Sequence, residues 1–99
     1  MKQFPTMKID EARQYAADGG QALHMMTGQW ARGYGGPKCF RDCTEFAHLF
    51  DQDAARLART AASLGVRRVV VCKRGTPSQH VDLVGKPLRR AKSGAIQYE

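Results

Sequence analysis

The fold is decided by residues 47–95, which read AHLFDQDAARLARTAASLGVRRVVVCKRGTPSQHVDLVGKPLRRAKSGA. Residues 51–64 have apolar side chains at helical spacing, and Gly65 is placed to end this predicted helix. Asp51 is its expected N-cap, because a carboxylate there can accept from the amides of the first turn. The many alanines predict close packing against a sheet. The solvent side of this helix is expected to carry Arg56 and Arg59.

The segment after this helix predicts two or three strands and one more helix. Residues 66–72 are rich in β-branched side chains, and their consecutive valines favour a strand that is covered on both faces. Residues 80–83 predict a second strand. Residues 86–93 predict a short helix, with Pro87 in its first turn, where a missing amide has no cost. Residues 95–98 can form a last strand.

The N-terminal half predicts a helix, an ambiguous segment and a loop. The first helix is expected after Thr6, which can cap it, and its end is expected at the pair Gly19-Gly20. Residues 21–26 suit a short strand and a buried helical turn equally. Residues 27–37 are rich in glycine and predict a connecting loop, since they lack the endings of known phosphate-binding loops. Residues 39–50 are expected to include a short helix that starts near residue 42 or 44.

Together these elements predict one domain over residues 1–99, with the glycine-rich loop at 27–37. The expected fold is α/β or α+β, with a small single-layer sheet of about three strands packed against two to three helices. The 99 residues are 42% hydrophobic and 25% charged, which is typical of one globular domain with a single modest core.

Composition also bears on location. The chain lacks any run of apolar residues long enough for a membrane-spanning helix, and its N-terminus lacks the apolar stretch of a signal peptide. The odd number of cysteines, three, fits a reducing compartment better than a disulfide scaffold. We therefore expect no membrane association and a cytoplasmic location.

Positive charge is concentrated in the second half of the chain. The net charge is +7, and residues 51–99 carry ten Lys and Arg against four Asp and Glu. Such a basic half attracts polyanions: nucleic acid, a nucleoprotein or an acidic protein surface. The alternative is a cationic surface that simply faces solvent. The candidate binding residues are Arg67, Arg68, Lys73, Arg74, Lys86, Arg89, Arg90 and Lys92.

Three residues are candidates for catalysis. His80 and Asp82 are two positions apart, so on an extended segment both side chains point to the same face. If the fold also brings His48 to them, the result is a set of two imidazoles and one carboxylate. That set suits a divalent metal ion or acid–base work on a phosphodiester. The alternative is a hydrogen bond at a turn, with His48 on the flank of a helix.

The cysteines offer a weaker metal site. Cys39 and Cys43 are four residues apart and would share one face of a helix, and with His48 and Cys72 they could bind zinc. The spacing differs from the two-residue knuckle of common zinc sites, so separate thiols are favoured, and no cofactor is indicated.

A helix-turn-helix is an alternative fold for the same region. Ala61, Gly65 and Val71 have the spacing of small, glycine and apolar residues that this DNA-binding motif requires. Its recognition helix would contain three consecutive valines, which are poor helix formers.

The chain also resembles a small uncharacterised domain family of bacteria and their phages. The resemblance rests on Ala47-His48-Leu49, on the helix that ends in Leu64-Gly65, on His80-Val81-Asp82-Leu83, and on the helix that closes at Gly94-Ala95. It covers about half of the chain. It implies the same small fold and marks His48, His80 and Asp82, but it implies no activity.

Three classes of function follow from these observations. The first is a small basic protein that contacts nucleic acid or a nucleoprotein through its C-terminal half. The second is a phage-type inhibitor that binds an acidic surface of a host protein. The third is an enzyme that uses His48, His80 and Asp82 on a phosphate-bearing substrate, and the sequence favours the first two classes over this one. The sequence does not distinguish DNA, RNA and protein as partners, and it does not give the oligomeric state.

Overall fold

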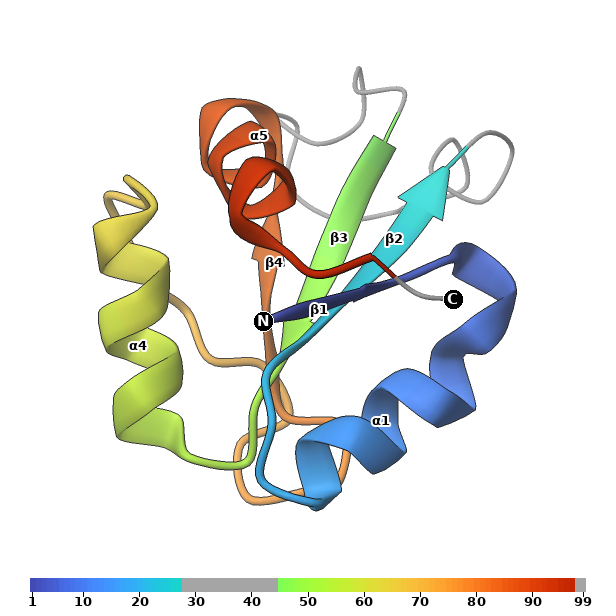
Figure 1. Cartoon of the computed structure of the whole chain (residues 1–99). Helices are drawn as coiled ribbons and strands as arrows, with labels where there is room; N and C mark the ends of the chain where they lie inside the picture. Colours follow the sequence, from blue (N-terminus) through green and yellow to red (C-terminus); the bar gives the residue numbers. More distant parts are fainter. Residues whose placement is uncertain (28–44, 98–99) are drawn as a thin grey trace.

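The computed structural model describes residues 1–27 and 45–97, and within them a four-stranded mixed sheet lies at the centre of the molecule (Figure 1). The strand order is β1-β2-β3-β4. β1 and β2 are parallel, whereas β3 is antiparallel to both of its neighbours. The strands are β1 (Lys2–Phe4), β2 (Ala22–Thr27), β3 (Glu45–Phe50) and β4 (His80–Leu83).

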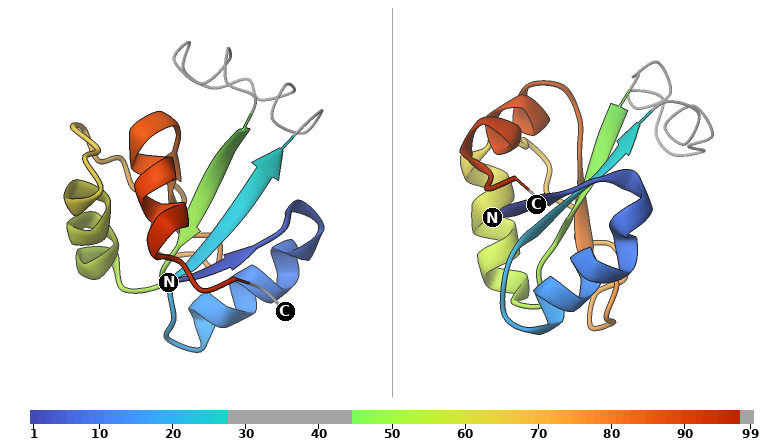
Figure 2. Two further views of the ribbon diagram at one scale, coloured as in Figure 1. Left: turned by 45° about the horizontal axis from the view of Figure 1, so that its top comes forward. Right: turned by 45° about the vertical axis from the view of Figure 1, so that its right-hand side comes forward.

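Helices cover both faces of this sheet. A short 3-10 helix, η1 (Thr6–Lys8), leads into α1 (Ile9–Ala17) on one face, while α4 (Ala54–Ser63) and α5 (Gly85–Gly94) lie together on the other (Figure 2, right). The fold is therefore a small α+β domain. This confirms the predicted architecture of a small sheet with two to three helices, with four strands in place of about three.

The face under α4 and α5 forms the larger apolar core. Alternate residues of the three long strands point to this face, among them Leu23, Leu49 and Val81, all at most 2% exposed. Leu57 of α4 and Leu88 of α5 pack against them and are equally buried. Of the alanines of α4, Ala61 is fully buried in this core.

The opposite face is covered by α1 over part of its width. Ala12 and Ala16 of α1 are fully buried against Phe4 and Phe50, and Ala22 joins the same small cluster. Beyond these residues this face of the sheet carries polar side chains, which form the site described below.

The residues before α4 have different roles from those expected. The N-cap is Asp53, whose side chain accepts from the amide of Arg56 at 3.0 Å. Asp51 is instead fully buried, and its two oxygens accept from the Arg56 guanidinium at 2.7 and 2.8 Å. Arg56 therefore reaches back to Asp51 and to the carbonyl of Gly19 while its side chain remains 38% exposed, and the prediction that Asp51 caps the helix is wrong.

Two further predictions of secondary structure are wrong. The short helix expected within residues 39–50 cannot include residues 45–50, because Glu45–Phe50 forms β3. A strand at 66–72 is also absent, since this segment is irregular and only Cys72 forms a bridge, with His80. Val70 is 56% exposed, which fits an irregular connection and not a covered strand. A helix-turn-helix is excluded with it, because residues 66–79 contain no helix.

Other predictions are confirmed. Gly65 ends α4 with a φ of 98°, a conformation that favours glycine, and its amide donates to the carbonyl of Ala62. Pro87 lies in the first turn of α5.

The predictions for the last strand and for Thr6 are not confirmed. The last predicted strand is reduced to one bridge between Ile96 and Lys2. Thr6 begins η1 and donates its hydroxyl to the carbonyl of Met25 instead of capping a helix.

Some predictions lie outside the described residues. These are the glycine-rich loop beyond Thr27, with Trp30, and the cysteine pair Cys39 and Cys43. Among the residues that are described, no helix is long and apolar enough to cross a membrane.

Candidate functional site: a histidine–aspartate cluster

Strand register places the predicted catalytic candidates side by side. His48 on β3 lies directly opposite Asp82 on β4, and on its other side it lies opposite His24 on β2. His80 is two residues before Asp82 and shares its face. The four side chains, His24, His48, His80 and Asp82, form what we call the histidine–aspartate cluster. The expected alternative, with His48 on the flank of a helix, is wrong.

The polar atoms of this cluster converge. His80 Nε2 lies 3.2 Å from Asp82 Oδ1, and His48 Nε2 lies 3.8 Å from the same oxygen. One ligand atom from each of these three residues lies within 4.8 Å of the other two. The side chains are between 11% and 18% exposed, so the cluster is shielded but accessible from solvent.

Phenylalanines enclose the imidazoles. Phe46 packs edge-on against His48 with ring centroids 5.4 Å apart, and Phe50 packs edge-on against His80 at 5.6 Å. Both phenylalanines are 2% exposed. An apolar wall of this kind lowers the local dielectric, which strengthens each polar interaction in the cluster and raises the cost of an unbalanced charge.

His24 is the member of the cluster that sequence reasoning missed. Its ring stacks on that of His48 at 5.4 Å between centroids, with Nδ1 3.2 Å from Nδ1 of His48. Its Nε2 lies 2.8 Å from the carbonyl oxygen of Thr6. The only signal in the sequence was a histidine in the ambiguous segment 21–26, and its role depends on the pairing of β2 with β3.

Burial controls the protonation of two imidazoles. The pKa of His48 is lowered to about 4, because burial, the largest cause, and the charges of His80, His24 and Arg13 together outweigh the opposing effect of Asp82. Burial is also the largest cause of the lowered pKa of His24. Both rings are therefore neutral at pH 7.

His80 behaves in the opposite way. Burial lowers its pKa, but the hydrogen bonds of His80 to the Asp82 carboxylate and to the Ser78 carbonyl outweigh burial, and the net result is a raised pKa. Its Nδ1 lies 2.7 Å from that carbonyl oxygen. The cluster thus holds a neutral imidazole, His48, beside an imidazole that gains a proton readily, and acid–base chemistry requires such a pair.

Two cations lie near enough to influence the cluster. The positive charge of Arg13 on α1 lowers the pKa of His24 and His48, and its guanidinium carbon lies 6.0 Å from the Phe50 ring centroid. The charge of Lys73 lowers the pKa of His80. An anionic ligand at the cluster would therefore be attracted from two sides.

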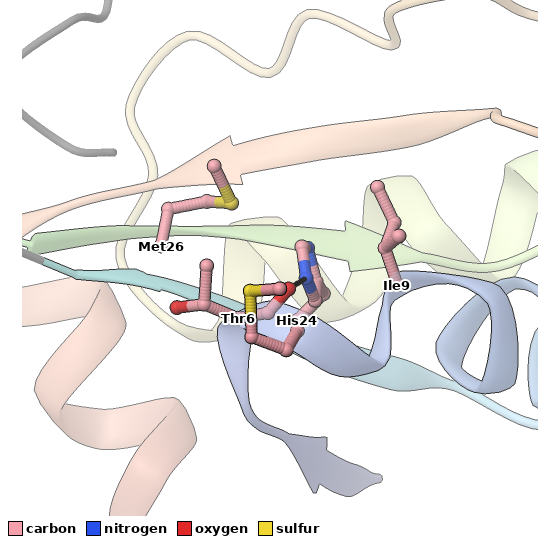
Figure 3. Close-up of a pocket in the computed structure, with 5 residues that line it drawn as sticks. Thr6, Ile9, His24 and Met26 are labelled. Carbon is pink, nitrogen blue, oxygen red and sulfur yellow. Dashed lines mark hydrogen bonds between the residues drawn. The ribbon is translucent and has the colours of Figure 1, made fainter. Parts of the chain in front are cut away.

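A hollow of about 240 Å³ borders His24 (Figure 3). It is lined mainly by apolar side chains from η1, α1 and β2, and the hydrogen bond of His24 to Thr6 forms part of its wall. The lining residues are Thr6, Met7, Ile9, His24 and Met26.

The predicted basic residues lie mostly away from the cluster. Of the eight, only Lys92 is not exposed, and it pairs with Glu45 at 3.2 Å. Arg90 donates to the carbonyl of Leu64 and so joins α5 to the end of α4. Helix α5 lies on the face opposite the cluster, whereas Lys73 and its neighbour Arg74 precede β4 on the way to His80 (Figure 1).

Cys72 is the one cysteine among the described residues. It is half-buried beside His80, and burial raises the pKa of its thiol, with a smaller contribution from Asp82. A raised pKa makes the thiol a poorer metal ligand and nucleophile at neutral pH. Cys72 is not part of the group of three converging ligand atoms.

Comparisons with protein-family models, with curated proteins and with solved structures give no match for this chain. The case for a function therefore depends on the geometry of the cluster and on the distribution of charge.

Proposed function

We propose that the protein is an enzyme that acts on a phosphate-bearing substrate, with His48, His80 and Asp82 as its catalytic residues. The observation that carries the proposal is the convergence of two imidazole nitrogens on one carboxylate oxygen in a shielded site. Surfaces rarely hold such a set by chance, because burying three ionisable groups together costs stability.

The charge around the cluster favours an anionic substrate. Arg13 and Lys73 both act on the imidazoles electrostatically, from α1 and from the turn before β4. A phosphodiester has the charge that such neighbours attract, and its cleavage needs a group that takes a proton and a group that gives one. The basic C-terminal half would draw a polymeric substrate such as RNA or DNA to the protein.

The test uses purified protein with labelled single- and double-stranded DNA and RNA, without metal and with Mg²⁺, Mn²⁺ or Zn²⁺. We expect cleavage that is abolished in His80→Ala and Asp82→Asn while the circular dichroism spectrum is unchanged. Asp18→Asn is the matched control, since Asp18 is exposed at the C-terminal end of α1 and its side chain accepts from Gln14 of the same helix. Absence of cleavage and of nucleotide hydrolysis under all these conditions would overturn the proposal.

A second candidate function is binding of nucleic acid without chemistry. The specific observation is that Arg67, Arg68, Lys86 and Arg89 are exposed and make no ion pair with any described residue. Cations that lack acidic neighbours are available to neutralise phosphates. Lys86 and Arg89 lie on α5, on the face opposite the cluster, and Arg67 and Arg68 lie in the irregular segment that follows α4.

A salt series separates this candidate from the alternatives. Binding of labelled nucleic acid that weakens steeply with salt supports the binding function. Arg89→Ala should reduce the slope of log affinity against log salt concentration by about the contribution of one phosphate contact. Lys8→Ala, on the other face, should leave the slope unchanged. No binding at low salt would overturn it, and would direct the search to an acidic protein surface as the partner. As part of the proposal the protein works in the cytoplasm, as its odd number of cysteines predicts.

A further inference from the structure

We infer that His48, His80 and Asp82 bind one divalent transition-metal ion of the zinc class, and that His24 is the positioning residue that turns His48 toward it. The inference concerns the same residues as the proposed function and names the cofactor that they would hold. It does not depend on the reaction, because the metal can be measured alone.

The first step is the assignment of protons along the row of imidazoles. A carbonyl oxygen can only accept, so His24 Nε2 must carry the proton that it donates to Thr6 at 2.8 Å. With one proton on the ring, at Nε2, His24 has a bare Nδ1, and the 3.2 Å contact then assigns His48 Nδ1 as the donor. His48 is therefore left with a bare lone pair on Nε2.

His80 is also oriented by a hydrogen bond from Nδ1. Its Nδ1 donates to the carbonyl oxygen of Ser78 at 2.7 Å, which leaves Nε2 to face Asp82. Metal-binding histidines characteristically donate their second ring N–H to a carbonyl or carboxylate, which fixes the ring and makes the other nitrogen a better ligand. His80 is held in this way, and the ring nitrogen of His24 takes the place of the carbonyl oxygen for His48.

The second step concerns the bare nitrogen of His48. His48 Nε2 lies 3.8 Å from an oxygen of Asp82, so an acceptor faces an acceptor without a proton between them. Asp82 is already paired with His80 at 3.2 Å, and a proton shared in that pair forms no hydrogen bond to His48 Nε2. In a shielded site such an arrangement is unfavourable unless a cation occupies the space.

The third step is the match of distances and ligand types. Two ligand atoms bound to one zinc ion at about 2.0–2.2 Å in tetrahedral geometry lie about 3.4 Å apart. The two measured separations, 3.2 and 3.8 Å, bracket this value. Two imidazoles and one carboxylate form a known ligand set for catalytic zinc, with one position left for water or substrate.

The primary test is calorimetric titration of the chelator-treated full chain with zinc chloride alone. We expect one ion per chain, and a loss of affinity of more than 100-fold in His80→Ala and in Asp82→Asn. Asp18→Asn is the matched control and should bind as the wild type does. The double variant Cys39→Ser/Cys43→Ser should also bind normally, since the inferred site contains no cysteine.

A second measurement reads the role of His24. The chain has three histidines, so long-range ¹H–¹⁵N spectra resolve the tautomer of each ring. We expect the proton on Nε2 of His24 and on Nδ1 of His48 and His80. In His24→Phe, His48 should shift toward the Nε2–H tautomer, and zinc should bind about 10- to 100-fold more weakly.

Several outcomes would overturn the inference. These are zinc binding that survives in Asp82→Asn, zinc binding that disappears in the cysteine double variant, and a wild-type His48 with its proton on Nε2. A protein that binds zinc as described but cleaves no phosphate ester would instead overturn the proposed function and leave the metal site standing. Cleavage that persists in excess chelator, together with no zinc binding in the titration, would support the function and overturn the metal site.

Discussion

The two faces of the sheet are built from the same strands but hold different kinds of side chain. On β3, Ala47 and Leu49 point to the face under α4 and α5 and are fully buried, while His48 points to the other face and remains partly exposed. The first face follows the rule that apolar surface is removed from water. The second face gives up apolar burial at four positions to hold three imidazoles and a carboxylate.

This difference separates stability from chemistry within one sheet. Substitutions on the α4–α5 face should change the free energy of unfolding and leave the cluster intact, whereas substitutions in the cluster should do the reverse. Proteins commonly accept such a cost at functional sites, where polar groups are held in positions that packing alone would not favour.

The largest effect is expected from Leu49→Ala on the apolar face. Leu49 is fully buried at the centre of the core, between Leu23 and Val81. Loss of its side chain should lower the free energy of unfolding by about 2–5 kcal/mol, from lost burial and from the cavity left behind. Urea denaturation measures this value. A change below about 1 kcal/mol would show that this face is not the main core.

Asp51→Asn should give the next largest effect, at the edge where the two faces meet. Burial raises the pKa of Asp51, but the hydrogen bonds from Arg56, Asp53 and Gln21 lower it more, so its pKa in the folded state is below the ordinary value of 3.8. The loss should be about 2 kcal/mol, since a charged hydrogen bond is removed while Arg56 stays partly solvated.

The sign of the pH dependence follows from that shift. A carboxyl whose pKa is lowered by folding adds stability that is present above pH 3.8 and is lost as the pH falls toward the lower pKa of the folded state. Urea denaturation between pH 7 and pH 3 should therefore show a smaller loss in Asp51→Asn than in the wild type. Equal losses in both proteins would contradict the role of Asp51.

Much of this comparison could be predicted from the sequence. The period of 3.6 residues gave α4 and α5, and the two-residue spacing of His80 and Asp82 put them on one face, because both signals are local. The side chains of residues 45–50 alternate between the two faces of the sheet, with Phe46, His48 and Phe50 on one face. The same local reasoning could therefore have predicted a strand there.

The rest depends on contacts between distant segments. Asp51 and Asp53 are equally good helix caps locally, but Gln21, which directly precedes β2, donates to Asp51 at 2.9 Å, and Asp53 is left to cap α4. His24 joins the cluster only through the register of β2 with β3. The valines at 69–71 have strand propensity, but only Cys72 pairs with the outer edge of β4.

A smaller effect on stability is expected from His48→Leu, which makes the polar face more like the apolar one. Leucine suits the phenylalanine walls of the cluster, and the substitution removes the unfavourable approach of His48 Nε2 to Asp82. The free energy of unfolding should change by less than about 1 kcal/mol, while zinc binding and cleavage are lost. Thermal unfolding tests the change in stability, and zinc titration of the same sample tests the loss of binding. A large destabilisation would show that His48 has a structural role.

The smallest effect is expected from Val70→Thr, outside both faces. Val70 is 56% exposed in the irregular segment between α4 and β4, so a hydroxyl in place of a methyl group loses little burial there. The free energy of unfolding should change by less than about 0.5 kcal/mol, as for most exposed positions. In a strand covered on both faces, the same substitution would bury an unpaired hydroxyl and cost about 1–3 kcal/mol. Urea denaturation of this variant beside Val81→Thr, a buried position on β4, therefore distinguishes an exposed connection from a covered strand within one experiment.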